Sequence, residues 1–168
     1  MGASPLRTFP SGTPVFLDAN VLINGLSGRS AECRNLLDRC AREDCFGVTT
    51  FEVISEVTHK LMLFEACAKK IISKESASLL RKRLKDITRL TQYWHQTERI
   101  FRMHIVVLPT DGNRLRSGYK VRASHGILTN DSLIVAAMQE SGLTSVASAD
   151  DDFDHVAGLT RYEPSDLP

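Results

Sequence analysis

The chain has 168 residues, of which 42% are hydrophobic and 24% are charged. These values are typical of a single soluble globular domain that is long enough to bury a core. The net charge of +1 excludes a strong basic field over the whole surface. A nucleic-acid partner would therefore require a local basic patch or a metal ion.

The sequence contains no recognisable targeting or membrane segment. The opening MGASPLRTFPSGTP has three prolines and lacks the apolar stretch of a secretory signal, so we expect a flexible tail at 1–13 before a single domain at 14–168. The longest apolar run is too short to cross a membrane, which predicts a cytoplasmic protein. The four cysteines lack paired C-x-x-C spacing and are expected to be reduced, buried thiols.

Short apolar runs alternate with amphipathic segments along the chain. In order, we predict a strand at 15–18, helices at 21–26 and from residue 30, a strand at 46–49 and a helix from 50 to about 67. Two helices within 69–102, with a break near 88–91, a strand at 105–108 and a helix at 110–124 follow. The chain ends with a helix capped by Asn130 that runs to about 140, a strand at 145–147, a turn at 150–153 and a weak edge strand at 159–162. Because no hairpin turn joins two strands, this order favours a three-layer α/β fold, with a central parallel sheet of four or five strands flanked by helices.

Acidic residues stand at the ends of several predicted elements. Asp18 and Asp150 follow the apolar runs VFL and VASA, and ligands of open parallel sheets bind beyond the carboxyl ends of the strands. Asp131 shares a helix face with Ile134 and Met138, which must face the core. Taken alone, Asp18 is better explained as a turn or cap residue. The inward placement of Asp131 favours a functional role, although the helix dipole also favours an aspartate in a first turn.

The long helix that begins near residue 50 offers two glutamates. At about 100° per residue, Glu56 lies roughly 100° from Val57, the centre of the apolar stripe, and Glu52 lies roughly 140° away. Glu56 is therefore predicted at the edge of the stripe and Glu52 nearer to solvent. For either residue alone, an ordinary surface glutamate is an equally good interpretation.

The predicted turn after the fourth strand carries a run of aspartates. A charge run usually forms a solvated loop, so at most two of them, such as Asp150 and Asp152, are expected to point inward. Carboxylates about 4–6 Å apart repel by roughly 4 kcal/mol per closest pair at an effective dielectric constant of about 20. A cluster of them would persist as anions only around a cation, and a hard divalent ion suits oxygen ligands.

Four motifs occur in one order along the chain. They are LDANVLI near the start, a glutamate inside a helix opened by threonine, NDSLIVAA, and S-x-D-x-D-F near the end. Together, over residues 15–164, they resemble the PIN-domain ribonucleases, and especially the VapC-type toxins of toxin–antitoxin pairs. The resemblance departs from compact toxins in two places: the chain between Glu56 and Asp131 is longer, and a proline-bearing tail precedes the first strand.

The resemblance also implies roles for individual residues. Carried over position by position, the catalytic residues and metal ligands are Asp18, Glu56, Asp131 and Asp150, with Asp152 as a further ligand and with Asn20 and Ser148 in supporting positions that form hydrogen bonds around the site. The sequence leaves open whether Asp150 or Asp152 is the fourth acidic ligand, and whether one or two ions bind.

The activity that the resemblance implies is a metal-dependent endoribonuclease. One or two Mg²⁺ or Mn²⁺ ions would lower the pKa of a bound water molecule and polarise a backbone phosphate. Hydrolysis of RNA would leave a 3′-hydroxyl and a 5′-phosphate. The implied partners are an RNA substrate, a cognate antitoxin and a second copy of the chain. In that homodimer, helices of the first half would form the interface, and both sites would open on one basic groove.

Two other classes of function stay open at this point. A haloacid-dehalogenase-like phosphatase also has an aspartate after its first strand, but it uses D-x-D where this chain has Asp18-Ala19-Asn20. A non-catalytic RNA- or protein-binding module on the same fold is the other alternative. The four filled acidic positions argue against it, because a module that only binds has no reason to retain a repulsive cluster.

Overall fold

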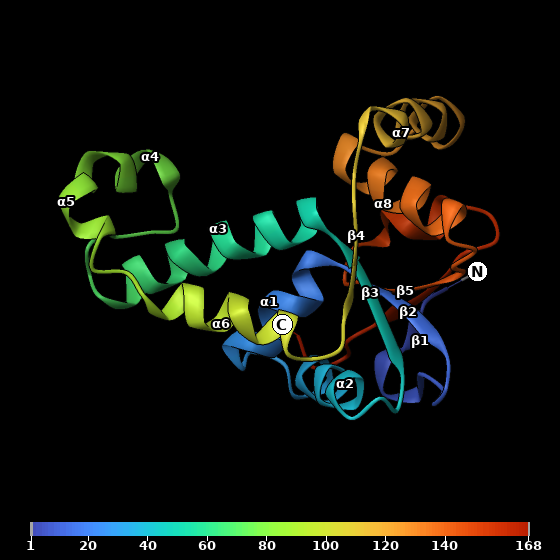
Figure 1. The fold of residues 1–168 in the computed structure, drawn as a ribbon, viewed down its shortest axis with the longest axis horizontal. Helices are drawn as coiled ribbons and strands as arrows, with labels where there is room; N and C mark the ends of the chain where they lie inside the picture. The colour runs from blue at the N-terminus through green and yellow to red at the C-terminus, as the bar shows by residue number, and fades with distance from the viewer. Residues whose placement is uncertain (1, 168) are drawn as a thin grey trace.

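The structure, a computed structural model that describes residues 2–167, has a central sheet of six parallel strands (Figure 1). The order across the sheet is β1-β6-β5-β2-β3-β4. The strands are β1 (Ser4–Pro5), β2 (Pro14–Leu17), β3 (Phe46–Thr50), β4 (Val106–Leu108), β5 (Ser145–Ala147) and β6 (Thr160–Glu163). The predicted α/β class and parallel sheet are confirmed, and the predicted number of four or five strands is too low.

Helices cover both faces of the sheet. The α-helices are α1 (Ala19–Ser27), α2 (Ala31–Ala41), α3 (Phe51–Ala68), α4 (Ala77–Leu80), α5 (Leu84–Ile87), α6 (Gln92–Phe101), α7 (Gly112–His125) and α8 (Thr129–Glu140), and the 3-10 helices are η1 (Leu6–Thr8), η2 (Arg81–Arg83) and η3 (Asp151–His155). In Figure 1, α7 and α8 lie on one side of the strands and α1 and α2 on the other. None of the helices in residues 2–167 is both long and apolar enough to span a membrane.

The central strand β2 brings the first acidic residue to the carboxyl edge of the sheet. It pairs with β3 on one side and β5 on the other, and Val15, Phe16 and Leu17 are fully buried. Such a continuous apolar run is expected of a parallel strand that is covered on both faces. The chain then enters α1 at Asp18. Because β2 and β5 are parallel neighbours, their carboxyl ends lie beside each other, at the edge where open parallel sheets bind ligands.

The segment at residues 4–9 is not the flexible tail expected from the sequence. β1 pairs with β6, with Ser4 opposite Tyr162. Leu6 and Phe9 are buried, and the ring of Phe9 packs edge-on against Tyr162 with 4.9 Å between the ring centroids. The burial of these two apolar side chains and the pairing with β6 hold the segment in place, although its prolines suggested a tail. For the same reason β6 lies between β5 and β1, and not at the edge as predicted.

We predict that Phe9→Ala lowers the free energy of unfolding by about 3 kcal/mol, the low end for removal of a buried phenylalanine. Thermal or denaturant unfolding measures this change. The exposed neighbour Arg7 provides a control, because Arg7→Ala removes only a 3.9 Å ion pair at the surface. Equal stability of Phe9→Ala and the wild type would mean that the segment is a tail in solution.

The segment between α3 and α6 forms a helical arm, residues 69–91, that extends away from the sheet (Figure 1). The sequence predicted one amphipathic helix here, followed by a break near residues 88–91 and a second helix. The break is confirmed, because α6 begins at Gln92. The first helix is instead divided into α4, η2 and α5, which fold back to bury Ile72, Leu80 and Leu90 in a small second core.

Candidate metal centre

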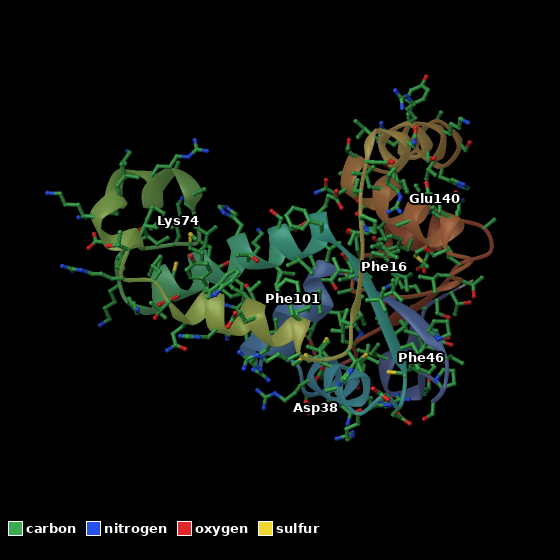
Figure 2. All side chains as sticks on the ribbon, viewed as in Figure 1. Phe16, Asp38, Phe46, Lys74, Phe101 and Glu140 are labelled. Carbon is green, nitrogen blue, oxygen red and sulfur yellow. The ribbon has the colours of Figure 1, made fainter. Side chains whose placement is uncertain are left out.

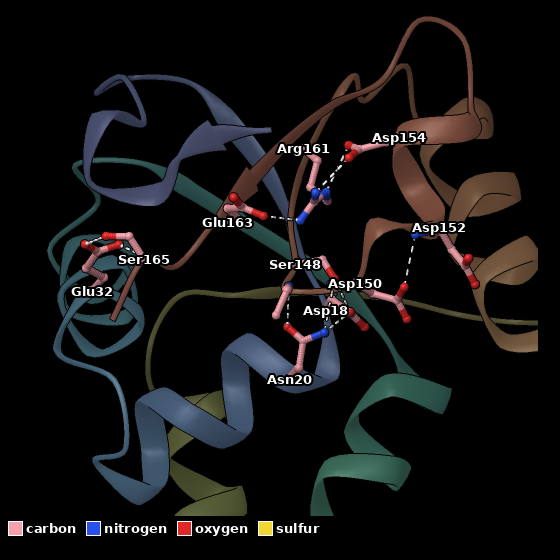
Figure 3. A network of polar contacts seen from close by, with 11 residues as sticks. Asp18, Asn20, Glu32, Ser148, Asp150, Asp152, Asp154, Arg161, Glu163 and Ser165 are labelled. Carbon is pink, nitrogen blue, oxygen red and sulfur yellow. Dashed lines mark hydrogen bonds and ion pairs between the residues drawn. The ribbon is translucent and has the colours of Figure 1, made fainter. Parts of the chain in front are cut away.

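Asp18 lies at the carboxyl end of β2, where it also caps α1 (Figure 3). One carboxylate oxygen accepts a hydrogen bond from the backbone amide of Ala19 at 2.6 Å. The other accepts from Asn20 Nδ2 and from Ser148 Oγ, both at 2.6 Å. Asp18 is only 8% exposed. Three donors therefore fix the orientation of this buried carboxylate before any ligand arrives.

Asn20 and Ser148 join the end of β2 to the loop that follows β5. Asn20 Oδ1 accepts a hydrogen bond from the backbone amide of Ala149 at 3.0 Å. Ser148 Oγ accepts one from the amide of Asp150 at 2.9 Å. Asn20 thus contacts Asp18 with its Nδ2 and the loop with its Oδ1, whereas Ser148 Oγ both donates to Asp18 and accepts from the loop. The two residues hold the loop and its aspartates against the first carboxylate.

A second group of carboxylates lies where α8 faces η3. One oxygen of each of Asp131, Asp150 and Asp152 lies within 4.8 Å of the other two. Asp150 caps η3 by accepting a hydrogen bond from the amide of Asp152 at 3.0 Å. Asp131 is in the first turn of α8, which begins at Thr129 without a side-chain cap. The predicted cap at Asn130 is therefore wrong, because the helix starts before that residue.

A cavity of about 680 Å³ opens between α1, α3, α8 and the loop after β5. Its lining includes four acidic positions that are distant in the sequence: Asp18, Glu56, Asp131 and Asp150. Glu52 lines it too, and its carboxylate accepts a hydrogen bond from Thr110 Oγ1 at 2.7 Å. Glu52 is half-buried and Glu56 is exposed, the reverse of the expected order. The position of a residue around one helix does not reveal Thr110, which contacts Glu52 from another part of the chain.

The electrostatics of the cavity reflect uncompensated negative charge. The pKa of Asp18 is raised to about 6, mainly by burial and in smaller part by the charges of Asp131 and Glu56, against the lowering effect of the hydrogen bonds from Ser148 and the Ala19 amide. The pKa of Asp131 is also raised, first by burial and then by the neighbouring aspartates after β5. Both shifts disfavour the ionised carboxylates. The site therefore carries more negative charge than its protein surroundings stabilise.

Two basic residues, Arg29 and Lys60, line the same cavity. Arg29 stacks over the ring of Phe64, with 3.8 Å from the guanidinium carbon to the ring centroid, and forms a 3.5 Å ion pair with Glu75. Lys60 is exposed on α3, one turn after Glu56. Sequence reasoning missed both cations, because neither belongs to a motif. Only the packing of α1 beside α3 brings them to the cavity.

Arg161 on β6 holds η3 in place. Its guanidinium donates two hydrogen bonds to Asp154, at 2.9 and 2.7 Å, and one to Glu163 at 2.6 Å (Figure 3). Arg161 is only 7% exposed, and its charge lowers the pKa of Asp154. One aspartate of the acidic run is therefore paired within the protein. This ion pair fixes the short helix that carries Asp152, a role that no local pattern indicated.

Most of the chain matches one known protein family. The PIN domain matches residues 15–159, which contain every acidic residue of the cavity. The chain belongs to the PIN domain family. PIN domains are generally nucleases, and PIN nucleases use divalent metal ions. The resemblance seen in the sequence is thereby confirmed.

This PIN domain shares its fold with several solved structures. VapBC2 from Rickettsia felis, bound to a DNA fragment from their promoter, has a TM-score of 0.58 at 11% identity, over 89% of this chain and 98% of that chain. A toxin–antitoxin complex from Klebsiella pneumoniae gives 0.55 at 17%, over 87% and 95%. PAE2754 from Pyrobaculum aerophilum gives 0.51 at 14%, over 89% and 91%. At these identities the likeness shows the fold alone. No curated protein matches the chain.

The side chains present in this PIN domain fit a hard divalent cation. All the candidate donors are carboxylate oxygens, which Mg²⁺ and Mn²⁺ prefer. Asp131, Asp150 and Asp152 would hold the ion, since their oxygens already approach one another closely. Asp18 and Glu56 face the same cavity, and their negative charges repel each other and that of Asp131. A bound cation would relieve this repulsion. The donor set therefore matches the metal ions that the family uses.

Proposed function

We propose that this PIN domain is a Mg²⁺- or Mn²⁺-dependent endoribonuclease. The observation that supports the proposal most is the meeting of carboxylates from β2, α3, α8 and the loop after β5 in one open cavity. Asp18, Glu56, Asp131 and Asp150 would be the catalytic residues and metal ligands, with Asp152 as a further ligand. The substrate would be the phosphodiester backbone of RNA, cleaved to a 3′-hydroxyl and a 5′-phosphate.

The side chains have distinct tasks in this proposal. When bound, the metal supplies a water of lowered pKa and polarises the phosphate. Asn20 and Ser148 keep Asp18 oriented through their hydrogen bonds. Arg29 and Lys60 would place positive charge beside the phosphates that flank the cleaved bond, where a charge-assisted hydrogen bond is strongest.

We further propose that the protein is the toxin of a toxin–antitoxin pair and acts in the cytoplasm. Two solved structures with this fold are toxin–antitoxin complexes, which supports an antitoxin as the partner of this chain. A neighbouring reading frame that encodes a small DNA-binding or acidic protein would agree with this assignment. Co-purification of the two gene products, with loss of nuclease activity in the complex, would test it directly.

The alternatives have less support. Membership of the PIN family argues against the haloacid-dehalogenase-like phosphatase, which would also require D-x-D in place of Asp18-Ala19-Asn20. A non-catalytic binding module would not need the close approach of Asp131, Asp150 and Asp152, which is unfavourable without a cation.

The test of the proposed nuclease is cleavage of a mixture of purified RNAs with Mn²⁺, with Mg²⁺ and with chelator. We expect internal cleavage with either metal, products that carry a 5′-phosphate, and no cleavage with chelator. Asp151→Asn is a suitable control protein, because Asp151 is exposed and lies outside the aspartate group. Cleavage that continues in chelator, or that is absent under every metal condition, would contradict the proposal.

We predict that the protein forms a homodimer in solution. Large apolar side chains remain exposed on the described part of the chain, among them Phe51 at 67% and Val106 at 54%, and such surfaces commonly mark interfaces. Helices of the first half, including α3, would contribute to the interface. Sedimentation velocity at micromolar concentration measures the mass, and a monomer alone would contradict this prediction.

A further inference from the structure

The charge of the chain is concentrated on the helical arm, residues 69–91. This segment contains eight Lys or Arg residues and two Asp or Glu residues, which gives it a net charge of +6. Because the whole chain carries +1, the remainder carries −5. A nearly neutral protein therefore combines an acidic body with a strongly basic arm. Such asymmetry is characteristic of a surface that meets a polyanion.

Most of the basic residues of the arm have no acidic partner. Lys69 pairs with Glu65, and Arg89 pairs with Asp86. The other six are exposed and form no ion pair within residues 2–167: Lys70, Lys74, Arg81, Lys82, Arg83 and Lys85. In Figure 2, Lys74 lies at the end of the molecule farthest from the sheet, among side chains that project into solvent. Their charge is available to a ligand.

The helical arm is packed against the rest of the protein and is not a loose loop. Its apolar side chains pack on the end of α3 in a core that includes Ile72, Leu80 and Leu90. The carboxylate of Glu65 accepts hydrogen bonds from the backbone amides of Thr91 at 3.0 Å and Tyr93 at 2.9 Å. These hydrogen bonds tie the end of the arm to α3, and the first residues of the arm follow directly after that helix. The backbone that carries the cations is therefore ordered before a ligand binds, which reduces the entropy lost on binding.

A second cavity, of about 700 Å³, lies within the arm between the end of α3 and η2. Three cations line it, Lys70, Lys82 and Arg83, together with Ser73 and the apolar side chains of Ile71 and Leu79. Ammonium, guanidinium and hydroxyl groups donate hydrogen bonds to phosphate oxygens, and the apolar walls suit a base or a sugar. This combination fits a nucleotide unit of a single strand.

The arm is also connected to the acidic cavity. Glu75 of the arm lines that cavity and pairs with Arg29, which stacks on Phe64. The helix α3 runs from the acidic residues to the arm, and at 1.5 Å per residue the path from Glu56 to Lys70 is about 21 Å. A substrate strand that leaves the cavity past Arg29 would thus reach the basic cavity within a few nucleotides.

We propose that the helical arm is a second RNA-binding platform, which holds the backbone of the substrate several nucleotides away from the cleaved bond. The inference rests on the proposed nuclease function and extends it. The arm would contact phosphates and so contribute affinity without base specificity. RNA long enough to reach from the acidic cavity to the arm would be preferred over a short oligonucleotide.

The test uses the double variant Lys82→Gln/Arg83→Gln in an Asp18→Asn background, so that the RNA stays intact. Its matched control is Arg7→Gln/Arg42→Gln, which removes the same charge from two exposed positions outside the arm. Polyuridylate is a suitable probe, because the electrostatic part of binding does not depend on sequence. Fluorescence anisotropy at several salt concentrations gives both the affinity and its salt dependence.

We expect the arm variant to bind polyuridylate at least about tenfold more weakly at about 0.1 M salt, with a salt slope that falls by about 1.4, the value for two lost single-strand contacts. The control should retain the affinity and slope of the Asp18→Asn protein. With the wild-type site restored, the arm variant should cleave a short oligonucleotide at the normal rate and long RNA more slowly.

The experiment distinguishes failure of the proposed nuclease function from failure of the proposed RNA-binding platform. If the wild type cleaves no RNA but the arm variant still loses binding, the proposed nuclease is wrong and the platform stands. If the arm variant and the control bind alike, or if the protein does not bind polyuridylate, the platform is wrong whatever the cleavage assay shows. RNA binding that is unchanged in the arm variant would instead favour an acidic protein as the partner of the arm.

Discussion

Asp18→Asn should abolish RNA cleavage while leaving the metal-free protein at least as stable as the wild type. The substitution retains the size of the side chain but removes one anion that faces the metal site. Metal-ion catalysis contributes several kcal/mol, and each 1.36 kcal/mol changes the rate tenfold, so we expect a loss of about a thousandfold or more. Initial rates with Mn²⁺ measure this loss.

The stability of Asp18→Asn depends on two opposing effects. The pKa of Asp18 is raised to about 6 from 3.8, so its ionised form costs about 3 kcal/mol in the folded protein at neutral pH. The asparagine does not carry this charge. Its NH₂ group would, however, face two donors, Asn20 Nδ2 and Ser148 Oγ, and two lost hydrogen bonds cost about 2 kcal/mol. The first effect is larger, so the balance favours the variant.

The pH dependence separates these effects. Because the pKa of Asp18 is raised in the folded state, its contribution to stability is complete below about pH 4 and is lost as the pH rises through about 6. In chelator, Asp18→Asn should therefore gain on the wild type across this interval. Asp18→Ala should be less stable than Asp18→Asn, since Ala19, Asn20 and Ser148 lose their acceptor. Denaturant unfolding from pH 4 to pH 7 measures each difference. A variant that is destabilised in chelator yet still stabilised by Mn²⁺ would contradict the assignment of Asp18 as a ligand.

Mn²⁺ should raise the melting temperature of the wild type by about 5–10 °C. Metal at about 100 times its dissociation constant stabilises the folded state by about 2.7 kcal/mol, and in a protein of this size each kcal/mol is worth about 2–4 °C. Replacement of Asp131, Asp150 or Asp152 by Asn should reduce the shift severely, because their oxygens lie within 4.8 Å of one another. Differential scanning fluorimetry with a Mn²⁺ titration measures the effect.

The matched control for these variants is Asp151→Asn. Asp151 is in the same 3-10 helix, is exposed, and does not belong to the aspartate group. It should retain the full Mn²⁺ shift. If Asp150→Asn loses the shift and Asp152→Asn does not, or the reverse, the result also decides which of the two is the fourth acidic ligand. Equal shifts in all the variants and the wild type would mean that Mn²⁺ binds elsewhere.

The acidic cavity illustrates how far the sequence can predict a site. Asp18 and Asp150 follow apolar strands, and the common edge of a parallel sheet brings such positions together, so their approach was predictable. Asp131 was predictable from its helix face. The choice between Glu52 and Glu56 was not, because Thr110 covers Glu52 from a segment 58 residues away. The sequence of one helix carries no information about the segments that pack against it.

The sequence by itself determined the α/β class, the parallel sheet and the family, because these follow from local patterns of apolar and acidic residues in a fixed order. Only the tertiary structure decided the sixth strand, which forms because Leu6 and Phe9 are buried beside β6. It also decided the pairing of Arg161 with Asp154, and the meeting of Arg29 with the acidic cavity. These contacts depend on how separate segments pack, and a side chain gives no local signal of a partner that only the folded chain brings within reach.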